Sequence, residues 1–186
     1  MEDSRIEVEV RSFISEEEFK KLLEFFKANA KFICEDFQET HYFKGNFDLR
    51  IQKNNFFSKI WLKTGKIHDE LREEIEIIFK REDFEKLEKL LGMLGFEVEI
   101  KWFRHRYQFD WNGVGVYLDY TKGYGYIIEL EKKEVRENAE ETLNKLKEML
   151  QGLGVRITPR EEFDKKFQYY KENWKNLIDG KDRFIN

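Results

Sequence analysis

The sequence predicts an α+β fold in which an antiparallel sheet of eight strands packs against four amphipathic helices. Eight stretches are predicted as strands, and along six of them apolar and charged faces alternate without an obvious slip, which is the period of a strand. Short turns join most of these stretches, as antiparallel neighbours allow. The charged face of this sheet lies either in water or inside a closed barrel. The four helices favour the barrel, because each of them needs an apolar outer wall to cover.

The first predicted strand sets the pattern for the others. Along Ile6–Arg11 the apolar side chains point one way, while Glu7, Glu9 and Arg11 point the other. A helix is expected to follow from Ser15, because a serine with glutamate three residues later forms a capping box. Two carboxylates and a guanidinium therefore stand in one row at the start of the chain.

Four further strands are predicted at 31–43, 47–52, 58–63 and 71–79, and turn residues such as Gly45-Asn46 separate them. Each of the last three strands places polar or charged side chains together on one face. These rows are Asp48, Arg50 and Gln52; Lys59, Trp61 and Lys63; and Arg72, Glu74 and Glu76.

The stretch 96–111 predicts a long strand with one irregularity. Trp102 has the same parity as Arg104 and Arg106, so one face of the strand would carry both an apolar and a charged row. We therefore predict a bulge near residues 102–103, because a bulge moves the following side chains to the other face. That bulge leaves open whether Lys101 or Arg104 faces the lumen.

Two strands and three helices complete the prediction. Asn112-Gly113 is a hairpin signal before a strand that begins at Val114 and carries Asp119. The last strand, from Tyr126, aligns Glu129, Glu131 and Lys133 on one face. Helical spacing of apolar residues predicts further helices at about 83–94, 136–150 and 160–177.

Composition indicates a single domain covering residues 1–186, with a barrel core at about 5–135 and C-terminal helices at about 136–178. The net charge of −4 argues against a general nucleic-acid binder, and no apolar run is long enough to span a membrane. The single cysteine excludes an internal disulfide and suggests a cytoplasmic protein. We expect a monomer or a homodimer.

Each charged row alone is most simply a solvated face. Counted together, however, the rows place seven basic and seven acidic side chains in a lumen that is nearly neutral. Two divalent ions would bring that lumen to about +4, close to the charge of a bound triphosphate. Oxygen ligands without histidine or cysteine favour Mg²⁺ or Mn²⁺ over Zn²⁺, and arginine suits phosphate. The bases are Arg11, Arg50, Lys63, Arg72, Arg104, Arg106 and Lys133, and the acids are Glu7, Glu9, Glu74, Glu76, Asp119, Glu129 and Glu131.

In this order the motifs resemble the CYTH domain, also called the triphosphate tunnel metalloenzyme family. The resemblance covers about residues 5 to 135 and begins with a Glu-x-Glu-x-Lys pattern, whose lysine is replaced here by Arg11. The other resembling motifs are Leu49-Arg50-Ile51-Gln52, Lys63-Thr64-Gly65, Arg72 with Glu74 and Glu76, Arg104-His105-Arg106, and Asp119 with Gly123, Gly125, Glu129 and Glu131.

The resemblance implies an eight-stranded antiparallel β-barrel, a tunnel with a charged lumen and helices outside. It implies metal ligands at Glu7, Glu9, Glu129 and Glu131, supported by Asp119, Glu74 and Glu76. It also implies phosphate-binding residues at Arg11, Arg50, Lys63, Arg72, Arg104 and Arg106, with Lys63 and Arg11 as the catalytic groups. Two departures weaken the match, because Arg11 replaces a lysine and Gln52 removes a phosphate-facing charge.

The leading functional expectation is a metal-dependent enzyme that hydrolyses a small-molecule triphosphate, such as tripolyphosphate, thiamine triphosphate or a nucleoside triphosphate. A class IV adenylyl cyclase, which makes cyclic AMP and pyrophosphate from ATP, is the alternative. A cyclase needs a nucleoside site, for which Trp61, Phe103 and Tyr117 are candidates, although core packing explains them as well. A further alternative is a non-catalytic module that binds polyphosphate.

Overall fold

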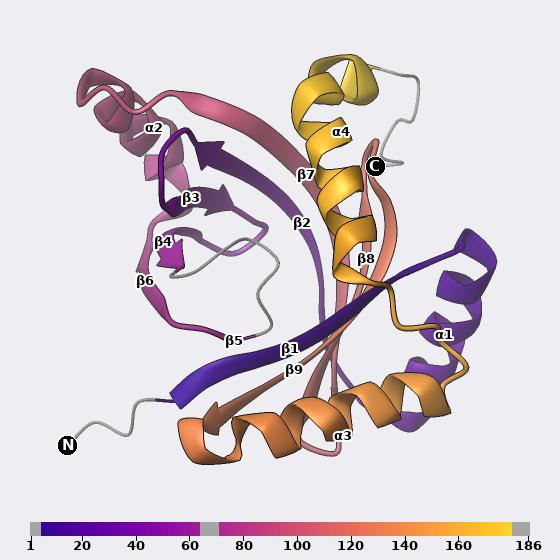
Figure 1. Cartoon of the computed structure of the whole chain (residues 1–186). Coiled ribbons are helices and arrows are strands. Elements are labelled where there is room, and N and C mark those ends of the chain that lie inside the picture. The colour runs from indigo at the N-terminus through magenta and orange to yellow at the C-terminus, as the bar shows by residue number, and fades with distance from the viewer. Residues whose placement is uncertain (1–4, 64–70, 180–186) are drawn as a thin grey trace.

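The computed structural model describes residues 5–63 and 71–179, and the side chains of Arg5, Leu71 and Arg72 are not described. The described chain forms one strongly curved antiparallel sheet with helices around it, which confirms the predicted α+β class (Figure 1). No helix within these residues combines the length and the apolar character needed to cross a bilayer.

The sheet has nine strands in the order β5-β1-β9-β8-β7-β2-β3-β4-β6, and all their pairings are antiparallel. Eight strands were expected, and the difference lies in the predicted strand 71–79, which is divided at Glu73. The strands are β1 (Arg5–Ile14), β2 (Lys31–Phe43), β3 (Asp48–Lys53), β4 (Ser58–Lys63), β5 (Leu71–Arg72), β6 (Glu74–Phe79), β7 (Val98–Trp111), β8 (Val114–Thr121) and β9 (Gly125–Val135).

The sheet curves round on itself without being closed by hydrogen bonds. Strand β5 pairs with β1 at one end of the strand order, and β6 pairs with β4 at the other end. These two strands follow each other in the chain, separated by Glu73 alone. The predicted barrel is therefore completed by the continuous backbone, because each half of the divided strand pairs on a different side.

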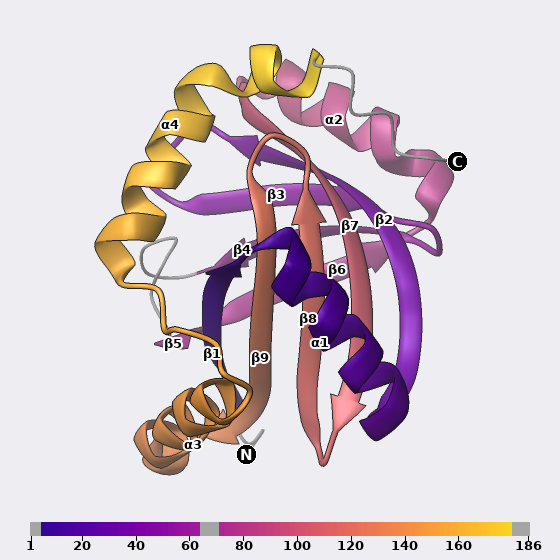
Figure 2. The same cartoon turned by 90° about the vertical axis from the view of Figure 1, so that its right-hand side faces the viewer.

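Two helices cover the apolar outer face on which β1, β8 and β9 meet (Figure 2). Helix α1 (Glu16–Asn29) begins at the predicted capping box: the Ser15 hydroxyl accepts from the Glu18 N–H at 3.2 Å, and the Glu18 carboxylate accepts from the Ser15 N–H at 2.6 Å. Helix α3 (Ala139–Gly152) follows a 3₁₀ turn, η2 (Arg136–Asn138), and buries Leu146 and Leu150 in the same cluster.

Helix α2 (Phe84–Met93), preceded by the 3₁₀ turn η1 (Arg81–Asp83), buries Phe84 and Leu91 against Ile51 and Phe43. These apolar residues belong to the outer side of β2 and β3. Since each of the three helices α1, α2 and α3 covers an apolar wall, the charged rows are left to face the inside of the curve.

Helix α4 (Arg160–Asp179) instead covers one end of the inner face. Its Phe163 and Tyr170 pack with Tyr42, Trp102 and Ile127, which extend the inner rows of β2, β7 and β9. This aromatic cluster fills the end of the curved sheet beside α4 with apolar side chains.

The predicted bulge near Trp102 and Phe103 is wrong. Strand β7 pairs with β2 without a shift from Ile100 to Gln108, and the irregularity in β7 lies one step earlier, at Glu99. Trp102 and Arg104 do share the inner face, and the covering helix α4 explains why one row can be apolar at one end and charged further along.

Candidate functional site

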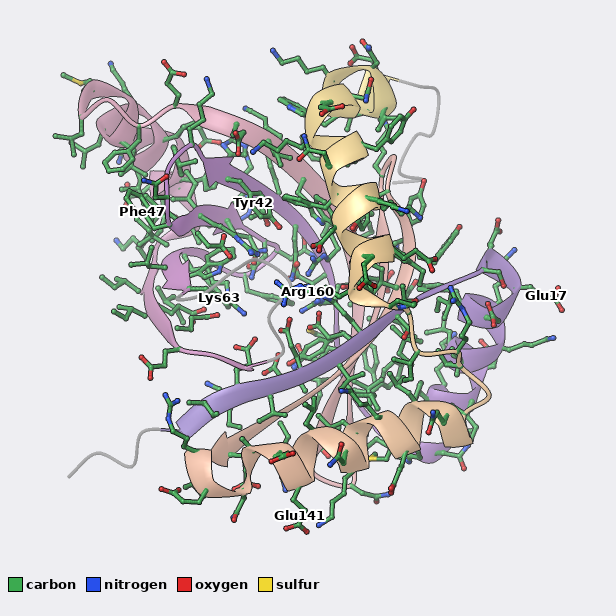
Figure 3. All side chains as sticks on the ribbon, in the orientation of Figure 1. Glu17, Tyr42, Phe47, Lys63, Glu141 and Arg160 are labelled. Atoms are coloured by element: carbon green, nitrogen blue, oxygen red, sulfur yellow. The ribbon has the colours of Figure 1, made fainter. Side chains whose placement is uncertain are left out.

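The inner face encloses a cavity of about 340 Å³. Figure 3 shows Lys63 and Tyr42 within the curve of the sheet, whereas Glu17 and Glu141 project outward from the helices. Of the fourteen charged residues that the sequence analysis placed in the lumen, all line this cavity except Asp119 and Arg72. The lining members are Glu7, Glu9, Arg11, Arg50, Lys63, Glu74, Glu76, Arg104, Arg106, Glu129, Glu131 and Lys133. Arg72 pairs through its backbone with Glu7, and its side chain lies outside the described part of the structure.

The acidic part of the cavity is built by the pairing of β1 with β9. Glu9 lies directly opposite Glu131 in this ladder, and Arg11 lies opposite Glu129. Burial and the charge of Glu129 raise the pKa of Glu131 to about 7. Burial and the charge of Glu131 likewise raise the pKa of Glu7 to about 8. This corner therefore holds more negative charge than its own cations neutralise.

Lys63 connects the two sides of the cavity where the hydrogen-bond ladder is incomplete. Its Nζ lies 2.6 Å from the carboxylate of Glu7 on β1 and 3.0 Å from that of Glu74 on β6. Burial alone would lower the pKa of Lys63, but Glu9, Glu7 and Glu74 raise it well above its usual value. Lys63 is thus a permanent cation between carboxylates of opposite walls.

Arg50 is held in a fixed orientation by two neighbours on the inner face. Its Nε and Nη2 each donate to the Asp48 carboxylate at 2.6 Å, which is a bidentate pair. Its guanidinium lies 4.3 Å from the ring centre of Tyr42, directly across the β2–β3 ladder. Since Asp48 uses one edge of the guanidinium, a ligand would meet the other edge.

Arg106 repeats this arrangement on the wall made by β7 and β8. It donates twice to Asp119 at 2.7 Å and lies 4.2 Å from the ring centre of Tyr117. Asp119 is only 1% exposed and also lies 3.5 Å from Arg104. The structure therefore places Asp119 behind the cavity wall, where its carboxylate faces two arginines.

The structure shows whether Lys101 or Arg104 of β7 faces the inside of the curved sheet. Arg104 lines the cavity, whereas Lys101 lies on the opposite face, 3.7 Å from Glu88 of α2. Of the three aromatic candidates for a nucleoside site, Trp61 and Tyr117 line the cavity and Phe103 does not. Lys59 Nζ lies over the ring of Trp61, 4.6 Å from its centre, so this side chain already covers one face of the ring.

Sequence reasoning missed several polar residues on β2 and in the turn after β3. Asp36, Gln38 and Cys34 share one parity on β2 and line the cavity, so the alternation of 31–43 carried a signal for them. Gln52, which the sequence analysis put at a phosphate-facing position, also lines it, and its amide donates to the Thr40 hydroxyl at 2.8 Å. The other lining residues that were not assigned to the site are Asn54, Phe56, Phe57, Lys59 and Gln108.

The acidic residues fit a hard divalent cation by their chemistry, because every donor is a carboxylate oxygen. In the part of the chain that the structure describes, no three carboxylate, imidazole or thiol groups yet converge on one point. Lys63 and Arg11 stand among these carboxylates, 2.6 Å from Glu7 and 3.6 Å from Glu9 respectively. A metal would therefore have to draw the carboxylates together and displace these cations.

Comparison with known proteins gives a family and a set of related structures. The family model described as "CYTH domain" matches residues 5–160. The PH1819 protein of Pyrococcus horikoshii OT3 is 28% identical, with a TM-score of 0.72 over 83% of this chain and 93% of that chain. A conserved hypothetical protein of Pyrococcus furiosus is 27% identical, with a TM-score of 0.70 over 81% and 91%.

A more distant structure shares the fold. A candidate adenylyl cyclase of Hippeastrum, described with a dominant triphosphatase activity, is 16% identical, with a TM-score of 0.64 over 89% of this chain and 96% of that chain. The comparison with curated proteins finds no match.

Proposed function

Because the chain belongs to the CYTH domain family, whose members include triphosphatases and class IV adenylyl cyclases, we propose that it is a divalent-metal-dependent enzyme acting on a linear triphosphate. Within that range we propose a phosphohydrolase. The observation that carries the proposal is the division of the cavity into a carboxylate corner on β1 and β9 and a wall of fixed arginines.

The arginines supply binding and orientation in this proposal. Asp48 and Asp119 already hold the guanidinium groups of Arg50 and Arg106, so little side-chain entropy is lost when phosphate oxygens bind their free edges. Phosphoryl transfer depends mainly on positioning and on stabilising charge, which are the properties that such a wall provides.

Glu7, Glu9, Glu129 and Glu131 would hold Mg²⁺ or Mn²⁺, which would neutralise phosphate oxygens and lower the pKa of a bound water. Lys63 would then be released from Glu7 and would stabilise the charge that develops on the transferred phosphoryl group. Arg11, next to Glu9, would contact the same phosphate from the β1 side.

The proposal is tested by ³¹P NMR of the protein with Mg²⁺ or Mn²⁺ and tripolyphosphate, thiamine triphosphate or ATP. Release of orthophosphate is expected, and Glu129→Ala should abolish it because a metal ligand is lost. Glu97→Ala is the matched control, since Glu97 is exposed and pairs with Lys44 at the surface. Pyrophosphate and cyclic AMP from ATP would instead identify a cyclase, and binding without turnover would identify a polyphosphate-binding module.

A further inference from the structure

An exposed aromatic ring stands where the cavity opens away from α4. Phe56 and Phe57 belong to the turn between β3 and β4, and both line the cavity. Phe56 is 62% exposed although it lines the cavity, so most of its ring is accessible to a ligand. Its position continues the charged wall outward, two residues after Asn54 and four after Gln52.

The turn that carries Phe56 is fixed by its backbone rather than by packing of the ring. The Asn54 side-chain oxygen accepts from the backbone N–H groups of Phe56 and Phe57, both at 2.8 Å. The Asn55 N–H donates to Asp36 at 2.9 Å, and Arg81 Nε donates to the Asn54 carbonyl at 2.6 Å. The backbone of the turn therefore places Phe56 at the cavity, although the ring itself stays mostly exposed there.

The two ends of the cavity differ in what surrounds them. At the end next to this turn the lining includes Asn54, Asp36 and Lys59, and the Asn55 N–H donates to Asp36. At the opposite end, the aromatic cluster under α4 is buried and is not part of the lining. A triphosphate held by the arginines would thus direct any attached group toward Phe56.

We propose that Phe56 is a stacking platform for a planar ring, so that the substrate is a triphosphate ester of an aromatic organic group rather than inorganic tripolyphosphate. An exposed ring on a turn whose backbone is fixed suits this role, since aromatic and heteroaromatic rings stack in offset geometry with little demand on their identity. The inference rests on the proposed function and adds the class of substrate to it.

The test compares the KM values of ATP, thiamine triphosphate and tripolyphosphate for the wild type and Phe56→Ala. We expect KM to rise about fivefold to tenfold for at least one ring-bearing substrate, which corresponds to the lower end of the effects measured when a stacked ring is removed. The KM of tripolyphosphate should stay unchanged. Phe56→Trp should restore the wild-type value. The substrate whose KM rises in Phe56→Ala identifies the organic group that stacks on Phe56.

Phe47→Ala is the matched control, because Phe47 is 48% exposed in the preceding turn and packs on Phe96 outside the cavity. An equal rise for tripolyphosphate, no rise for either ring-bearing substrate, or the same rise in Phe47→Ala would overturn the inference. If the wild type turns over none of the three compounds, the proposed function fails. Calorimetric affinities of the same variants then decide the inference, and equal affinities of Phe56→Ala and wild type refute it.

Discussion

Replacing Asp119 by asparagine should weaken the fold and strengthen anion binding at the same time. Asp119 is 1% exposed, accepts two hydrogen bonds of 2.7 Å from Arg106, and lies 3.5 Å from Arg104. Asparagine has nearly the same shape but no charge, so two guanidinium groups would face each other without their shared counter-ion. The same loss leaves more positive charge beside the cavity.

The magnitude follows from the burial of this pair. Removing one partner of a buried ion pair costs about 3–5 kcal/mol of the free energy of unfolding. In a domain of this size each kcal/mol lowers Tm by about 2–4 °C, so we expect a decrease of about 6–20 °C. Tripolyphosphate should bind more tightly without added metal, and it should recover part of the lost Tm because it binds only the folded protein.

Urea denaturation, scanning calorimetry and titration with tripolyphosphate measure these effects. Glu97→Gln is the control, since it removes an exposed carboxylate paired with Lys44 and should leave both Tm and affinity unchanged. A Tm within about 2 °C of wild type, or weaker binding of tripolyphosphate, would refute the reasoning. If Asp119 is a metal ligand as well, Mn²⁺ affinity will fall in the same variant.

Two further predictions concern the packing of α4 and the response to acid. Gly123→Ala should lower Tm more than Gly113→Ala: both glycines have positive φ, but a Cβ at Gly123 would lie 2.6 Å from Leu177 of α4, whereas Gly113 has open space. Equal decreases in Tm for the two variants would show that Leu177 of α4 does not pack against Gly123. Burial alone would raise the pKa of Glu39, but hydrogen bonds from His41 and a lysine lower it to about 2. The contribution of Glu39 to the free energy of unfolding is therefore present above pH 4.5 and lost toward pH 2. Over that range the Tm of Glu39→Gln should fall less than the Tm of the wild type.

The two-residue period of strands was sufficient to find most of the site. It placed Glu9 with Arg11, and Glu129 with Glu131, on one face without knowledge of which strands are neighbours. The order of motifs then added the antiparallel tunnel. These features were predictable because they depend on local alternation, which each strand carries in its own sequence.

Features that depend on packing between distant elements were not predictable in this way. Trp102 has the parity of the charged row, and only the position of α4 shows why it can be buried there. Asp48 opens a short strand and reads as a solvated charge, yet it holds Arg50 through two hydrogen bonds. The division of the predicted strand 71–79 at Glu73 likewise depends on distant strands, because β5 pairs with β1 and β6 pairs with β4.

The direct opposition of Glu9 and Glu131 has a consequence for the order of folding. These residues lie far apart in the sequence, so β1 can pair with β9 only after the chain between them has been made and collapsed. That pairing brings two carboxylates together and must work against their repulsion. A cation or a proton that neutralises them would lower this barrier, so a metal bound at the proposed site would also help to assemble it.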